Sequence, residues 1–287
     1  MTPTVKAFFD EATFTVSYVI ADPESGTAAI IDSVLDFDQA SGRTSTHSAD
    51  QMIEYVDKHD LNVAWILETH VHADHLSAAP HLKLKLGGKT GVSDLITSVQ
   101  STFKDVFNLG DEFSVDGAQF DRLMTGGDLL ELGSMNIRVM HTPGHTPACL
   151  TYVAGDCAFI GDTMFMPDFG TARADFPGGD AATLYQSIQS ILALPDETRL
   201  FMCHDYKAPG RDEFAWETTV AEQRANNVHI GGGKTEQEFV EFRSNRDTQL
   251  GMPKLILPSI QVNIRAGEMP PADDNGVVYL KLPVDVL

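Results

Sequence analysis

Residues 69–75 read Thr-His-Val-His-Ala-Asp-His, so that three histidines and one aspartate fall within six positions. Neutral imidazole and carboxylate are good ligands for zinc, iron and manganese, and a folded protein rarely keeps them so dense without a metal. The apolar run at 63–67 comes directly before this segment and is typical of a buried strand. The cluster therefore predicts a metal site in a loop at the end of a strand.

Three further ligand-type residues also follow strand-like runs. His145 comes after the run at 137–140, Asp162 after 158–160, and His204 after 200–203. If four strand ends converge, their side chains line one cleft on a rigid support. The residues predicted for this cleft are His70, His72, Asp74, His75, His145, Asp162 and His204.

The remaining elements must hold these strand ends together. Alternating or continuous apolar runs predict strands at 14–20, 28–32, 129–139 (broken at Gly133), 150–160, 255–264 and 277–282. Helical spacing predicts helices after a capping box at 48–51, over 92–107, and from Asp180 to Leu194. Strands followed by mixed helices in both halves predict an α/β protein, an αββα sandwich of two sheets flanked by helices. We expect one domain over 1–287, with a C-terminal extension at 205–287.

The bulk properties exclude several classes of partner. The chain has 287 residues, a formal net charge of −21 and a pI of about 4.6. A strongly acidic surface repels nucleic acid and anionic membranes, so we expect neither as a partner. No secretory signal or membrane-spanning run is visible, and three cysteines make no disulfide framework, so we expect a cytoplasmic protein.

The other histidines and the cysteines are interpreted as structural. Isolated histidines usually lie at the surface or in the core with satisfied hydrogen bonds, and we interpret His47, His59, His81 and His229 in this way. Cys149 and Cys157 are interpreted as buried thiols. Cys203 is interpreted likewise, with its side chain pointing away from His204 along the strand.

Taken together, these motifs resemble the metallo-β-lactamase-fold superfamily over nearly the whole chain. The resemblance implies that His70, His72 and His145 bind a first metal, that Asp74, His75 and His204 bind a second, and that Asp162 bridges them. Within the superfamily, the chain resembles a divergent bacterial subgroup of the persulfide dioxygenases. The segments that carry this second resemblance are 69–75, 142–149, 161–162 with 170–176, 183–188, 204–206 and 263–267.

The persulfide dioxygenase resemblance implies one Fe(II) per chain, held by His70, His145 and Asp162. Two histidines and one carboxylate leave coordination positions open for a thiol persulfide, such as glutathione persulfide, and for O₂. His72, Asp74, His75 and His204 would then orient the ligands by hydrogen bonds. The products would be sulfite and thiol, in sulfide detoxification.

Two alternatives stay open. All seven ligands of a dinuclear site are present, so a glyoxalase II-like thioesterase with zinc or a mixed zinc and iron centre is the main one. A non-catalytic metal-binding protein is the other, and the complete ligand set argues against it. For an anionic thiol, Arg173, Arg211 and Tyr206 are the candidate contacts. The resemblance also implies a homodimer.

Overall fold

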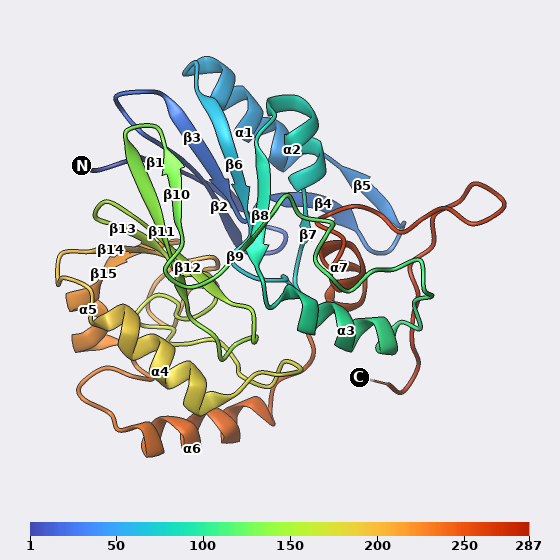
Figure 1. The fold of residues 1–287 in the computed structure, drawn as a ribbon. Coiled ribbons are helices and arrows are strands. Elements are labelled where there is room, and N and C mark those ends of the chain that lie inside the picture. Colours follow the sequence, from blue (N-terminus) through green and yellow to red (C-terminus); the bar gives the residue numbers. More distant parts are fainter. Residues whose placement is uncertain (287) are drawn as a thin grey trace.

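The first sheet lies in the N-terminal half of the chain. Figure 1 shows the computed structural model, which describes residues 1–286. The strand order is β1-β2-β3-β6-β8-β9, antiparallel from β1 to β3 and parallel from β3 to β9. Its strands are β1 Thr4–Asp10, β2 Thr15–Ala21, β3 Thr27–Ile31, β6 Asn62–Leu67, β8 Lys89–Ser93 and β9 Arg122–Met124. A short sheet beside it contains β4 Val34–Asp38, β5 Arg43–Ser45 and β7 Leu76–Ser77.

The second sheet has the order β10-β11-β12-β13-β14-β15, and only the β13–β14 pair is parallel. Its strands are β10 Leu129–Leu132, β11 Met135–His141, β12 Leu150–Ala154, β13 Cys157–Phe159, β14 Arg199–Phe201 and β15 Glu217–Thr219. The turn between β10 and β11 contains Gly133 at a φ of +64°, a conformation that glycine adopts without strain. The strands predicted at 129–139 and 150–160 are confirmed as two hairpins.

Alternation along the strands explains why two sheets pack face to face. In β2, Tyr18 and Ile20 point into a core shared with Ile137 and Tyr152 of the second sheet. Val19 points to the opposite face, where it packs in a core with Met52 of a helix. Each sheet therefore needs apolar cover on its outer side as well.

Five of the seven helices within residues 1–286 supply that cover, and Figure 1 shows them on the outer sides of the two sheets. Helices α1 and α2 cover the first sheet, and α4, α5 and α6 cover the second. Helices α3 and α7 pack together in a separate core at one end of the molecule. Their bounds are α1 His47–Lys58, α2 Ala79–Leu86, α3 Ile96–Val106, α4 Ala181–Leu192, α5 Val220–Asn226, α6 Glu236–Asp247 and α7 Ile256–Asn263. The predicted αββα sandwich is confirmed.

Several local predictions are wrong. The apolar run at 255–264 is not a strand but the short helix α7, whose residues are buried on nearly all sides, so that no helical periodicity is visible in the sequence. Residues 277–282 form no strand. The predicted helix at 92–107 starts later, because Val92 belongs to β8. Helix α1 begins at His47, with no side-chain cap, whereas the predicted cap of α4 by Asp180 is confirmed by its bond from the Thr183 amide.

The C-terminal part from residue 205 packs on both halves of the sandwich through β15, α5, α6 and α7. Within residues 1–286, no helix combines the length and the apolar character that crossing a membrane requires.

Candidate metal centre

Four strand ends deliver the predicted ligands to one place. The loop after β6 carries the first four, the loop after β11 carries His145, and Asp162 and His204 follow β13 and β14. They form two groups, and within each group one ligand atom of every residue lies within 4.8 Å of the others. One group is His70, His145 and Asp162, and the other is His72, Asp74, His75 and His204.

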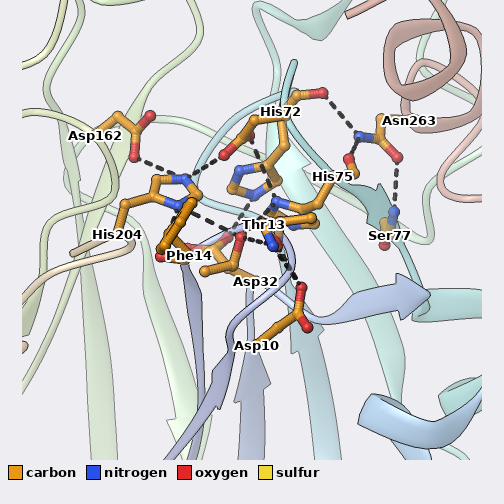
Figure 2. A network of polar contacts seen from close by, with 12 residues as sticks. Asp10, Thr13, Phe14, Asp32, His72, His75, Ser77, Asp162, His204 and Asn263 are labelled. Atoms are coloured by element: carbon orange, nitrogen blue, oxygen red, sulfur yellow. Dashed lines mark hydrogen bonds and ion pairs between the residues drawn. The ribbon is translucent and has the colours of Figure 1, made fainter. Parts of the chain in front are cut away.

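Asp162 lies between the two groups. Its Oδ2 is 3.8 Å from Nε2 of His70 and 3.6 Å from Nε2 of His145. Its Oδ1 is 3.4 Å from Nε2 of His204, which is also 2.8 Å from Oδ2 of Asp74. Figure 2 shows Asp162 and His204 facing each other. This is the arrangement that a carboxylate bridging two cations requires.

The ligand atoms are buried and find no hydrogen-bond partner outside the ligand set. Nε2 of His70 and His75 and Nδ1 of His72 have none, and Nε2 of His204 faces only Oδ2 of Asp74 and Oδ1 of Asp162. Buried polar atoms are normally paired, so atoms of this kind aimed at one space fit bound metal rather than a polar core. The predicted residues therefore fit a metal centre, and their number and grouping suit two ions.

The charge of the centre leads to the same conclusion. Asp32, Glu68, Asp74 and Asp162 are four carboxylates around the histidines, and among the described residues no lysine or arginine pairs with any of them. Buried carboxylates need compensating positive charge. Two divalent cations supply four positive charges, whereas one supplies two.

The pKa shifts show how the protein compensates when no cation is bound. Burial lowers the pKa of His204, but Asp74 and Asp162 outweigh this and raise it to about 9. Burial likewise opposes protonation of His72, and Asp32 and Glu68 raise its pKa above the ordinary value. His70 has a lowered pKa because it is buried beside His72 and His145. Metal binding would replace the protons on His72 and His204.

Residues outside the predicted set hold the ligands in place. Nε2 of His72 lies 3.0 Å from Oδ1 of Asp32 and 3.2 Å from Oε2 of Glu68, which leaves Nδ1 for a metal. Nδ1 of His145 is 2.8 Å from the carbonyl oxygen of Arg173. Asp32 could have been found by the strand-end rule, since it directly follows β3.

The orientation predicted for Cys203 is wrong, although its burial is confirmed. Its Sγ lies within 4.8 Å of ligand atoms of Asp162 and His204, and of Asp32 and His72. Cys203 lies beyond the end of β14, so strand alternation no longer sets its direction. Burial raises the pKa of this thiol well above its ordinary value.

A cavity of about 550 Å³ opens beside the metal centre and includes Asp74, His145 and Asp162 in its wall. Of the predicted substrate contacts, Arg173 and Tyr206 line it, but the Arg173 guanidinium is paired with Asp175. Arg211 lies outside the lining and pairs with Asp168 and Asp205.

The cavity wall also contains residues that were not predicted from the sequence as substrate contacts. They are His229, Arg243, Arg246 and Lys254, from the region around α6. Of the four histidines interpreted as structural, His229 lines the cavity, and His47, His59 and His81 do not. Arg246 and Lys254 are exposed and make no ion pair within residues 1–286. They lie far from the histidine motifs in sequence, so only the fold reveals them.

Comparison with known proteins supports this description of the fold. Over nearly its full length, the chain is 55% identical to a probable metallo-hydrolase of Burkholderia pseudomallei, covering 99% of this chain and all of that protein. It is 48% identical to glyoxylase B2 of Dictyostelium discoideum, covering 99% and 97%.

More distant relatives include proteins named as persulfide dioxygenases. The chain is 28% identical to the human mitochondrial persulfide dioxygenase ETHE1, covering 93% of this chain and 90% of that protein. The crystal structure of ETHE1 from Myxococcus xanthus matches with a TM-score of 0.73 at 29% identity, covering 92% and 100%. The family model of the metallo-beta-lactamase superfamily matches residues 10–204. This match includes all seven predicted ligands, and the chain belongs to the metallo-beta-lactamase superfamily.

Proposed function

We propose that the protein is a metal-dependent hydrolase with a dinuclear centre, and that it cleaves a thioester. The observation that carries this proposal is the pair of buried ligand groups joined by Asp162. The relatives at about 50% identity, named as a probable metallo-hydrolase and a glyoxylase, support a hydrolase over a dioxygenase.

The ligand residues would have distinct tasks in this reaction. His70, His72 and His145 would hold one ion, Asp74, His75 and His204 the other, and Asp162 would bridge them. Bound divalent metal supplies polarisation of the thioester carbonyl and a water of lowered pKa. Asp162 and the histidines fix where that water and the carbonyl meet.

Tyr206 is the proposed hydrogen-bond donor to the substrate. Its ring stacks on His204 at a centroid distance of 5.7 Å, and the residue lines the cavity. Burial and the nearby carboxylates Asp74 and Asp162 raise the pKa of Tyr206. The hydroxyl therefore stays protonated at neutral pH and can donate to an oxygen that gains negative charge.

The cavity favours an anionic thiol as the leaving group. Arg246 and Lys254 provide two exposed positive charges in a protein with a net charge of −21. The Nδ1 of His229 accepts a hydrogen bond from the Thr171 amide at 2.9 Å, so that Nε2 carries the proton and can donate. These three groups suit a carboxylate-bearing thiol such as glutathione.

A single preparation tests the proposal. The protein is purified without added metal, its metal content is measured, and thioester cleavage is followed with a glutathione thioester. We expect two metal ions per chain and cleavage without oxygen uptake. One iron per chain, with oxygen uptake from glutathione persulfide and no thioester cleavage, would refute it.

Persulfide dioxygenase activity is the second candidate. The group His70, His145 and Asp162 provides two histidines and one carboxylate by itself, as a mononuclear iron site needs. The similarity to the two ETHE1 proteins supports it. The substrates would be a glutathione-like persulfide and O₂, and the same preparation distinguishes the two activities. The homodimer stays a prediction, which sedimentation would check.

A further inference from the structure

A carboxamide from the C-terminal part of the chain binds the back of the histidine loop. Asn263, the last residue of α7, is 5% exposed. Its Nδ2 donates to the carbonyl oxygens of His72 at 2.9 Å and His75 at 2.8 Å. Its Oδ1 accepts from the Ser77 amide at 2.8 Å. Figure 2 shows these bonds on the side of the loop away from Asp162.

The loop depends on this side chain because it has little regular structure of its own. Between β6 and the two-residue strand β7 the backbone bends without forming a helix, strand or hydrogen-bonded turn, yet His72 and His75 are buried. Buried carbonyl groups without a partner are costly. Asn263 therefore satisfies three backbone groups that no ladder satisfies.

The turn after α7 is shaped to bring Asn263 this close. Gly267 has a φ of +89°, and a Cβ there would lie 2.9 Å from the Ser77 carbonyl oxygen and 2.6 Å from Cδ of Pro80. A larger residue would push α7 away from the loop. Two features therefore allow the contact: the side-chain amide of Asn263 makes the hydrogen bonds, and the lack of a side chain at Gly267 allows the close approach.

The bonds reach one proposed ligand of each ion. His72 is a proposed ligand of the ion held with His70 and His145, and His75 is a proposed ligand of the ion held with Asp74 and His204. Among the other ligands, Nδ1 of His70 lies 3.0 Å from Oγ1 of Thr69, and His145 is held by the Arg173 carbonyl. Loss of Asn263 would therefore loosen one ligand of each ion.

We propose that Asn263 is a positioning residue for the metal centre, through His72 at one ion and His75 at the other. It acts through the main chain, by fixing the direction from which His72 and His75 present their rings. The inference rests on the dinuclear centre proposed above. It makes the C-terminal part of the chain a component of the metal site, in addition to its packing role.

The test is a cobalt titration of metal-free protein, followed by visible absorption and by competition with a chelator. Asn263→Asp is nearly the same size and keeps the acceptor for Ser77, but it places an oxygen opposite the two carbonyls. Asn263→Ala removes all three bonds. Gln261→Ala is the matched control, because Gln261 is a buried carboxamide on the same helix that bonds Leu257 and Lys281 instead.

We expect wild type and Gln261→Ala to bind two cobalt ions. Both Asn263 variants should bind both ions at least tenfold more weakly and show a changed visible absorption spectrum. Thermal unfolding of the metal-free proteins shows whether each variant folds. If Asn263→Ala does not fold, the near-isosteric Asn263→Asp still decides the test. Two ions bound as tightly as in wild type, or weaker binding with an unchanged absorption spectrum, would overturn the inference.

Failure of the proposed function can be distinguished from failure of the role proposed for Asn263. A wild-type protein that binds a single ion contradicts the dinuclear centre itself. In that case unchanged affinity in Asn263→Asp overturns the role of Asn263 as well, and a tenfold loss supports it.

Discussion

Glu68 is the second carboxylate beside the His72 ring, and its Oε1 accepts a hydrogen bond from Oγ of Ser77. Glu68→Gln keeps the shape but removes the charge that makes His72 a good ligand. We expect metal affinity to fall about 10- to 100-fold. Competition with a chelator measures this. The control is Glu217→Gln, because Glu217 forms an exposed ion pair with Arg199, and this change should leave the metal affinity unchanged. An equal loss of affinity in Glu68→Gln and Glu217→Gln would contradict the prediction.

Arg246 and Lys254 are proposed to attract an anionic substrate. Single changes to alanine should raise KM about two- to fivefold, as roughly 0.5–1 kcal/mol per exposed charge implies, with little change in kcat. The effect should shrink at high salt because exposed charges are screened. Steady-state kinetics measure it, with Lys58→Ala on α1 as the control. A lower kcat with unchanged KM would argue against binding at this end of the cavity.

The seven proposed ligands could be predicted from the sequence because each follows a strand-like run, and Asp32 follows such a run as well. Asp32 reaches the histidine loop across 37–40 positions. The contact of Asn263 could not be predicted, because it meets the loop across 186–191 positions and nothing local in the sequence marks it. Glu68 adjoins the motif, but its role depends on the direction in which the His72 ring turns.

At the scale of elements, the loop that carries His145 packs closely against α4. Gly144 has a φ of +132°, and a Cβ there would lie 2.3 Å from the backbone nitrogen of Leu184. Gly144→Ala should therefore cost at least about 3 kcal/mol of stability and weaken metal binding. Gly42→Ala, at a φ of +67° in open space, should cost about 1 kcal/mol. Urea denaturation compares them, and equal costs would contradict the packing argument.

The segment between α5 and α6 carries His229 into the cavity wall. Burial, followed by the charges of Arg243, Arg246 and Lys234, lowers the pKa of His229 to about 3. Between pH 6.5 and 3 the unfolded chain binds a proton that the folded chain does not, so stability falls as the pH falls.

His229→Gln removes this dependence while it can still accept from the Thr171 amide. Relative to wild type, the variant should therefore gain stability as the pH is lowered from 7 to 4.5. Urea denaturation of the metal-free proteins at both values measures the difference. A difference that stays constant with pH would contradict the assignment.

Elements with clear periodicity were predictable, and the buried ones less so. The strands before the ligands and helix α4 alternate or repeat visibly in the sequence. Helix α7 does not, because seven of its eight residues are buried, and its apolar run looks like a strand. The error matters, since α7 is the element that carries Asn263.

At the scale of the whole molecule, metal should stabilise the fold strongly. The proposed ligands come from both halves of the sandwich, and four carboxylates, three of them buried, repel one another without cations. Metal present at about 1,000 times its Kd adds about 4 kcal/mol, which corresponds to a Tm higher by on the order of 10 °C. Calorimetry before and after chelation measures this. A Tm that does not change, or is not restored by added metal, would contradict the charge argument.

The position of Asn263 also affects when the centre can form in the cell. A chain under synthesis exposes its N-terminal part first. The histidine loop leaves the ribosome nearly 190 residues before the side chain that holds it in shape. Ligands from His70 to His204 can therefore be present on a nascent chain while the loop is still free to move. On the proposed role of Asn263, the native geometry of the loop is complete only after residue 263 has been synthesised.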